Sequence, residues 1–428
     1  MELKQLFKAS AIATALVLAG CGGDINISEG DIDNSVTNNN GGNTGGDTGG
    51  DTGSDDTAPG EVSSFLSGEV SDAFGQSVEV RVLSGRLTAD DADDQGVITL
   101  TNDTVWALEG PVFIGNDKAD SVTLAIEEGT VIFGRTGADY LVVSRDSKIE
   151  AEGTASSPII MTSFNDVVGD EVGAGQWGGV VILGNGTSTK CPQDGSDCAL
   201  QVEGAEEGAV FGGTDDTDSS GILKYVVVKY AGFEIAPDNE LNGITFGGVG
   251  SGTEVDYVQV HSNADDGVEF FGGTVSVNNI YLDNNQDDAV DWTEGWNGTV
   301  TNTYITHTNA DFSTAFEGDG VNNNPTFVNV TAISTVGGTA LQFKKESGAI
   351  ITNLYLEGYD TNLDFRDDGA LTNVMIDGAA AVLTEAYNTG TQVDISTWTS
   401  GVGLTRAYLN SLSKKGRIVI GPFFGTLS

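Results

Sequence analysis

The 428-residue chain carries a formal net charge of −45 and contains 60 glycines but only seven prolines. A protein this acidic repels nucleic acid, anionic lipid headgroups and polyanionic substrates such as pectate, so none of these is an expected direct partner. Cations, cationic partners and neutral glycans are compatible with the charge.

The N-terminal segment 1–20 has the organisation of an export signal. Lys4 and Lys8 precede an apolar run at 9–19 that is too short to span a bilayer. The run ends in Leu-Ala-Gly-Cys at 18–21, which resembles the lipobox of bacterial lipoproteins, where the cysteine is acylated. We therefore expect acylated Cys21 to anchor the chain to a lipid membrane. The resemblance to Gram-negative lipoproteins, with Gly22 after the cysteine, implies the outer membrane or the cell surface.

Residues 21–60 are rich in Gly, Asp, Asn and Thr and contain almost no large apolar side chain. Such a segment cannot bury enough surface to offset the entropy of ordering it, so it predicts a flexible tether. A tether of this length reaches roughly 30 to 40 Å. The folded part is expected to start near residue 61 and to continue as a repeat to residue 386. The segment 387–428 breaks the repeat and is a candidate C-terminal cap.

The central part of the chain repeats itself. Residues 258–270, 280–292 and 304–316 align without gaps, and the second offset is slightly longer than the first. Short runs of Val, Ile, Tyr and Phe alternate there with Gly, Asn and Asp turns, and no long stretch has helical periodicity. A short period of this kind, made of short strands and turns, is typical of a solenoid. The sequence predicts an all-β fold, a parallel β-helix with protected ends.

Equivalent residues of such a solenoid stack in columns, about 4.8 Å apart. The gapless alignment places Phe270, Trp292 and Phe316 in one core column. It also places three asparagines in a ladder of side-chain amides at a turn: Asn263, Asn285 and Asn309.

Acidic side chains form columns too. Asp265, Asp287 and Asp311 share one column, Asp266 and Asp288 share the next, and Glu269 and Asp291 lie on the following strand. Stacked carboxylates repel, and therefore raise their pKa values, splay into water or hold a cation. Carboxylate and turn-carbonyl oxygens suit calcium, so Asp265, Asp287, Asp311, Glu269 and Asp291 are candidate metal ligands. The alternative is a solvated acidic edge.

The same alignment places Asp283 between His261 and His307. These three residues are a candidate ligand-binding column, able to raise the histidine pKa values or to bind a transition metal weakly. The alternative is a polar face without a ligand. Cys191 and Cys198 flank a turn-rich hydrophilic loop and predict a local disulfide in an oxidising compartment.

Several long motifs occur in order along the chain: Gln-Trp-Gly-Gly-Val-Val-Ile-Leu-Gly at 176–184, Phe-Gly-Gly-Thr at 211–214, Gly-Ile-Leu-Lys-Tyr at 221–225, Asn-Gly-Ile-Thr-Phe-Gly-Gly-Val-Gly-Ser-Gly at 242–252 and Asp-Asp-Gly-Val-Glu-Phe-Phe-Gly-Gly at 265–273. They resemble a family of bacterial right-handed parallel β-helix surface lipoproteins that is sometimes labelled "multidrug transporter". The resemblance implies the fold and the envelope location, and it carries over no catalytic residue. A transporter role is not expected, because no segment after Cys21 is apolar enough to cross a bilayer.

The functional hypothesis is a binding or scaffold module on the cell envelope. Its β-helix face would recognise a glycan, a nutrient or an outer-membrane receptor, with Trp296 among the exposed aromatic side chains that could stack on a ligand. The alternative is a polysaccharide-active glycoside hydrolase that uses the clustered aspartates as acid and base. Solenoids stack carboxylates whatever their function, so we favour binding over catalysis.

Overall fold

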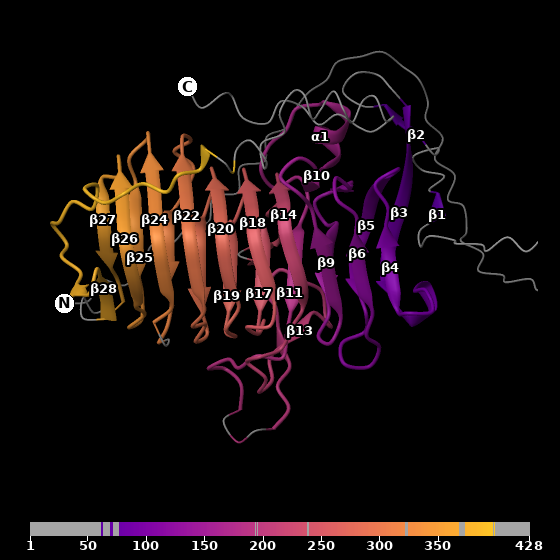
Figure 1. The fold of residues 1–428 in the computed structure, drawn as a ribbon, viewed down its shortest axis with the longest axis horizontal. Coiled ribbons are helices and arrows are strands. Elements are labelled where there is room, and N and C mark those ends of the chain that lie inside the picture. Colours follow the sequence, from indigo (N-terminus) through magenta and orange to yellow (C-terminus); the bar gives the residue numbers. More distant parts are fainter. Residues whose placement is uncertain are drawn as a thin grey trace, which may run out of the picture. The chain divides into compact units, whose positions relative to one another are not determined.

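In the computed structural model the chain forms a parallel β-solenoid (Figure 1). The structure describes residues 61–62, 69–71, 77–396 and 398, apart from gaps at 193, 195, 238, 322–323 and 368–372. The predicted signal, Cys21 and the tether lie outside the described residues, as does most of the predicted C-terminal cap. The described part includes a 3-10 turn, Ala89–Asp91, and the short helix α1, Phe164–Val168.

Three parallel sheets run along the solenoid, and neighbouring strands in each come from successive turns. Sheet 1 consists of β4 (Val97–Leu100), β6 (Thr123–Ile126), β9 (Lys148–Glu152), the first halves of β14 (Gly221–Lys229), β18 (Glu254–His261), β20 (Ser276–Asp283), β22 (Thr299–His307), β24 (Thr326–Ser334) and β26 (Ala349–Glu357), and β28 (Val374–Ile376). Sheet 2 consists of the first halves of β3 (Ser77–Leu87) and β5 (Val105–Ile114), then β7 (Val131–Gly134), β10 (Ile159–Ser163) and the second halves of β14, β18, β20, β22, β24 and β26.

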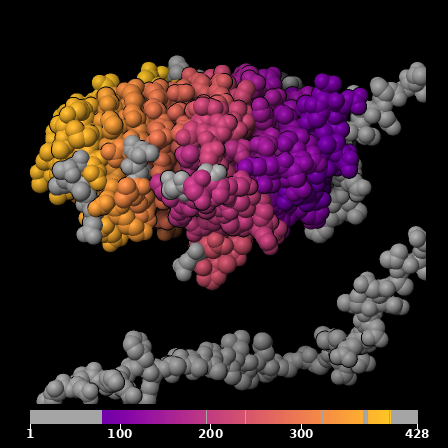
Figure 2. Space-filling model, turned by 90° about the horizontal axis from the view of Figure 1, so that it is seen from below, coloured from indigo at the N-terminus to yellow at the C-terminus, as the bar shows by residue number. Residues whose placement is uncertain are grey.

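Sheet 3 begins with the second halves of β3 and β5 and continues through β8 (Tyr140–Val143), β11 (Gly179–Leu183), β17 (Ile244–Gly247), β19 (Val268–Phe271), β21 (Asp288–Thr293), β23 (Thr314–Gly318), β25 (Thr339–Phe343) and β27 (Thr361–Phe365). The colours of Figure 2 change steadily along the long axis, because each turn stacks on the one before it. The predicted parallel β-helix is confirmed.

Aromatic side chains stack inside the solenoid, although not all in the predicted column. Phe270 lies in register with Trp292, as expected, but Phe316 pairs with Val290 instead. Phe270 also stacks on Trp296 with 4.1 Å between ring centroids. The prediction that Trp296 is exposed is wrong: its side chain is fully buried and its indole N–H donates to the carbonyl of Val275.

The third turn of the aligned repeat differs from the first two in its corner. Asp283 pairs with Thr306 rather than His307, and Asp288 pairs with Thr314 rather than Phe312. Between these pairs the chain uses positions 307–313, where the previous turn uses 284–287, so the corner between sheets 2 and 3 is longer in the third turn. The gapless alignment therefore misplaces both β22 and β23. Every predicted column that includes a residue from 304–316 is out of register with the structure.

The asparagine ladder lies at a different corner from the predicted one. Asn263 and Asn285 are fully buried, but Asn309 is exposed. The observed ladder occupies the kink between sheets 1 and 2, where the amide nitrogen of each asparagine donates to the amide oxygen of the one before it, at 2.9 to 3.1 Å. Its members all have a positive φ: Asn279, Asn302, Asn329 and Asn353. Asparagine suits this position because it tolerates the left-handed conformation.

Two terminal segments cover parts of the solenoid that would otherwise be exposed to solvent. β1 (Glu61–Val62) and β2 (Glu69–Ser71) pair antiparallel with β3, which protects the free edge of the first turn. After β29 (Ala379–Ala380), which pairs antiparallel with β28, the described part of the chain turns back over earlier turns. The Leu356 N–H donates to the Tyr387 carbonyl, the Val393 N–H donates to the Thr331 hydroxyl, and the Trp398 ring meets that of Tyr257 edge-on.

A long connection, residues 184–220, joins β11 to β14 and projects from the solenoid near β13 (Figure 1). It holds the two-stranded sheet of β12 (Leu200–Gln201) and β13 (Val210–Phe211) and the predicted disulfide between Cys191 and Cys198. Buried Arg145 secures it, because its guanidinium donates to the carbonyls of Cys198 and Gly212. A second, smaller hairpin follows, formed by β15 (Glu234–Ala236) and β16 (Asn239–Glu240).

The ladder makes the backbone conformation at the kink testable. Asn302→Ala removes two side-chain hydrogen bonds and leaves alanine at a φ of 59°, which asparagine tolerates better, so we expect the free energy of unfolding to fall by about 2 to 4 kcal/mol. Asn302→Gly should lose less, because glycine adopts a positive φ without strain. Denaturant unfolding measures both variants. Equal losses would show that the strain of a positive φ plays no part.

Candidate functional site

A line of carboxylates follows the outer side of sheet 3. Glu269 and Asp291 occupy equivalent positions on β19 and β21, as predicted, and Glu317 on β23 comes next. Their sequence neighbours Phe270, Trp292 and Phe316 lie in the core, so the alternation of a strand turns the three acids the other way. Glu317 was missed because the gapless alignment places Ala315 opposite Asp291.

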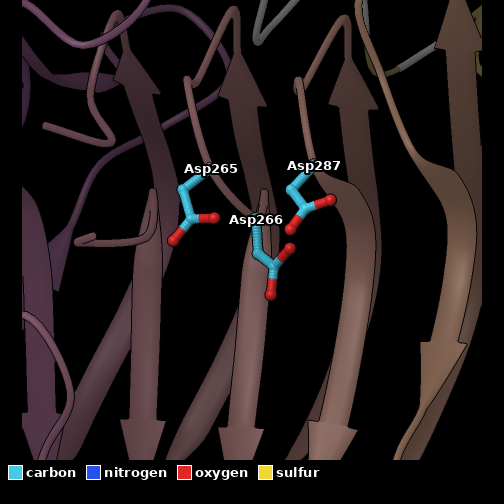
Figure 3. A group of neighbouring side chains, drawn as sticks. All are labelled: Asp265, Asp266 and Asp287. Atoms are coloured by element: carbon cyan, nitrogen blue, oxygen red, sulfur yellow. The ribbon is translucent and has the colours of Figure 1, made fainter. Parts of the chain in front are cut away.

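The corner between sheets 2 and 3 adds an outer group. Oxygen atoms of Asp265, Asp266 and Asp287 lie within 4.8 Å of one another, and Figure 3 shows their side chains converging. The predicted pair of Asp265 and Asp287 is therefore brought together. Asp311 does not join this group, but it lines the same open pocket of about 480 Å³ and accepts a hydrogen bond from Gln286 at 3.2 Å. Glu240 of the β15–β16 hairpin also lines the pocket.

Two further groups continue inward from this corner. Asp266, Glu269 and Asp291 form one, and Asp288, Asp291 and Glu317 form the other, again with one oxygen of each residue within 4.8 Å of those of its group. Asp266 belongs to the outer group as well, and Asp291 to both inner ones. Seven carboxylates thus form a continuous chain along the corner and the adjoining strands. The Lys344 ammonium ends this chain with an ion pair to Glu317 at 2.6 Å.

Burial sets the protonation of this chain. Desolvation, helped by the charges of Asp287 and Glu240, raises the pKa of Asp265 to about 8. Desolvation and neighbouring carboxylates also raise the pKa of Asp266, Asp288 and Asp291 well above the usual range, and desolvation raises that of Glu269. Carboxyl groups in this situation either keep their protons near neutral pH or share a bound cation.

Neutral donors orient the inner carboxylates without neutralising them. The Asn242 amide donates to Glu269 at 2.7 Å, the Thr314 hydroxyl donates to Asp288 at 2.5 Å, and the Asp288 N–H donates to Asp266 at 2.9 Å. The side chains are therefore held in place as an all-oxygen surface. Such a donor set fits a hard cation such as calcium, which accepts six to eight oxygen ligands in loose geometry.

A family model for a pectate-lyase-like β-helix domain matches residues 92–412. The chain belongs to this family. No curated protein and no solved structure matches it. This pectate-lyase-like β-helix domain covers all seven carboxylates of the chain described above. It extends past residue 386, where the sequence predicts that the repeat ends. No helix among the described residues is long and apolar enough to cross a membrane.

The predicted histidine column of this domain holds only in part. His261 Nδ1 lies 2.7 Å from the Asp283 carboxylate, but the next residue in register is Thr306, whose hydroxyl donates to Asp283 at 2.6 Å. His307 is not a member: it is buried, bonds the Tyr359 hydroxyl through Nδ1 and stacks on Phe312. Burial lowers the pKa of His307 to about 4, which leaves it a neutral core residue.

The column extends in the other direction to a residue that the sequence did not single out. Lys229 precedes His261 in register, and its buried ammonium contacts Asp166 of α1 at 2.5 Å. Desolvation lowers the Lys229 pKa to about 8, against the opposing effect of Asp166. This row of Lys229, His261 and Asp283 fixes α1 and one corner of the domain by ion pairs and hydrogen bonds.

The raised carboxyl pKa values predict how the pH affects stability. Asp265 binds a proton up to a pH of about 8 in the folded state, but only to about 4 in the unfolded state, so folding takes up a proton between these values. Its contribution is fully present below pH 4 and is lost as the pH rises through 8. In a chelator, the melting temperature should fall between pH 5 and 8, and Asp265→Asn should reduce that slope. A melting temperature that does not change over this range would contradict the burial of these groups.

Proposed function

We propose that this protein is an envelope-anchored, surface-displayed binding protein whose β-helix recognises a neutral glycan, a nutrient or an outer-membrane partner through calcium. The observation that carries the proposal is the open pocket lined by carboxylates, with Asp265, Asp287 and Asp311 on the solenoid and Glu240 on the hairpin. Calcium at this pocket would meet protein oxygens on one side and leave positions free for ligand oxygens on the other. Glycan hydroxyls supply ligands of that kind.

Membership of the pectate-lyase-like family fits a polysaccharide ligand. The net charge of −45 weakens the case for a polyanionic one, since repulsion acts over the whole surface. A neutral glycan avoids that repulsion and still offers paired hydroxyls to a cation. The proposal therefore combines the fold, the charge and the oxygen-rich pocket.

A glycoside hydrolase is the second candidate, and the buried carboxyl groups favour it. Asp266 and Asp288 have raised pKa values and could act as acids, while neighbouring carboxylates could act as a base or nucleophile. Turnover of a neutral or acidic glycan that Asp287→Asn or Asp288→Asn abolishes would defeat the binding-only proposal. Binding that these variants weaken, without products, would support it.

Calcium should stabilise the protein beyond its effect on ionic strength. A ligand at a hundredfold excess over its Kd raises the free energy of unfolding by about 2.7 kcal/mol. Melting should therefore rise more with millimolar calcium than with sodium chloride of equal ionic strength, which only screens charge. Asp287→Asn should reduce that difference and weaken calcium-dependent glycan binding.

The matched control for this experiment is Asp94→Asn, which removes the same charge from an exposed turn outside the pocket. It should leave the calcium response unchanged. Equal effects of calcium and sodium on the wild-type protein would remove the outer calcium site from the proposal.

The membrane anchor has its own test. Cys21→Ser should abolish incorporation of labelled palmitate and release the protein from the membrane fraction, because the acyl chains supply the membrane affinity. A Cys21→Ser protein that still incorporates palmitate would show that the lipobox assignment is wrong.

A further inference from the structure

The two inner carboxylate groups differ in how their charge is balanced. Asp288, Asp291 and Glu317 have the Lys344 ammonium beside them, bonded to both Glu317 oxygens. Asp266, Glu269 and Asp291 have no counterpart: in the described part of the chain, no ion pair joins any of these three to a basic side chain. One group thus carries its own cation, and its neighbour lacks one.

A second observation points to a ligand at the group without a lysine. Asn242 is only 5% exposed, and its amide nitrogen donates to Glu269 at 2.7 Å, so its side chain is directed at this group. Its Oδ1 has no hydrogen-bond partner among the described residues, and neither has the buried Oδ1 of Asp291. A buried oxygen without a partner is unfavourable, so the group leaves two acceptors unsatisfied, one on Asp291 itself and one on the neighbouring Asn242 amide.

The orientation of the Asn242 amide supports this interpretation. When Glu269 is ionised, the state that binds a cation, exchanging the oxygen and nitrogen of the amide would place its oxygen against the carboxylate and lose the 2.7 Å hydrogen bond. The oxygen therefore remains the unpartnered atom. A positive ion can satisfy it and the carboxylates together.

We propose that Asp266, Glu269 and Asp291, with the amide oxygen of Asn242, bind a hard divalent cation of the calcium type. This interior site is separate from the outer pocket and does not depend on glycan binding. Asn242 precedes β17, Glu269 lies in β19 and Asp291 lies in β21, so the ion links three successive turns of sheet 3. Its role is to hold these turns in register, as Lys344 does for the turns that follow.

The test counts calcium ions in the full-length protein after chelation and reloading, by calorimetry. We expect Glu269→Gln to weaken the interior site at least tenfold and to leave the outer site intact. Asp287→Asn, which belongs only to the outer group, should do the reverse. Unchanged calcium binding by Glu269→Gln would overturn the interior site, and a loss of all binding in Asp287→Asn would overturn it as well.

Terbium gives a second readout that reports the interior site. Trp292 directly follows Asp291, so terbium bound there should luminesce when the indole is excited. Emission should persist in Asp287→Asn and fall at least tenfold in Glu269→Gln. Glu269→Gln should still fold, since the amide oxygen can accept the Asn242 hydrogen bond and one repelling charge is gone; melting in chelator at or above the wild-type temperature checks this. Emission that is equal in the two variants would contradict the proposal.

Discussion

In-register stacking of successive turns governs this protein. Equivalent residues lie about 4.8 Å apart, so each side chain meets a neighbour from the same position of the next turn. Whether this stacking stabilises or destabilises the fold depends on the type of side chain at that position. Asparagines at the kink exchange hydrogen bonds and aromatic rings stack in the core, whereas acids on the outer side of sheet 3 repel one another. The same geometry that stabilises the interior concentrates negative charge on one face.

That concentration is resolved in two ways within a short stretch of sheet 3. At Glu317 the chain supplies its own cation from Lys344, which follows closely on Gln342, the next member of the same column. At Glu269, in the described part of the chain, it supplies the Asn242 amide and neighbouring carboxylates but no basic side chain. An ammonium group neutralises a site permanently, whereas an oxygen cage makes the stability of the site depend on the ions around it. The outer pocket has the same composition but opens to solvent.

Much of this arrangement follows from the sequence where consecutive turns have the same length. Aligning 258–270 with 280–292 correctly pairs Glu269 with Asp291, Phe270 with Trp292 and His261 with Asp283. The next turn is longer at its corner, so Phe316 and His307 lie outside their predicted columns. For the same reason the alignment misses Glu317, which follows Asp291 in the acidic column of sheet 3. The three extra corner residues are invisible to a gapless alignment because neither strand changes its own pattern. The burial of Trp296 could not be predicted either, because it depends on a contact with Phe270, outside any repeat position.

The returning C-terminal segment changes how the solenoid can come apart. A linear stack of repeats, each touching only its neighbours, can fray one turn at a time from either end. Here Tyr387 is bonded to the turn of β26, Val393 to that of β24, and Trp398 lies against Tyr257 at the kink of β18. The last turn cannot peel away while this segment stays attached to the middle of the stack. The C-terminal turns from β18 to β26 therefore form one cooperative unit, and opening it requires several turns to lose their contacts together.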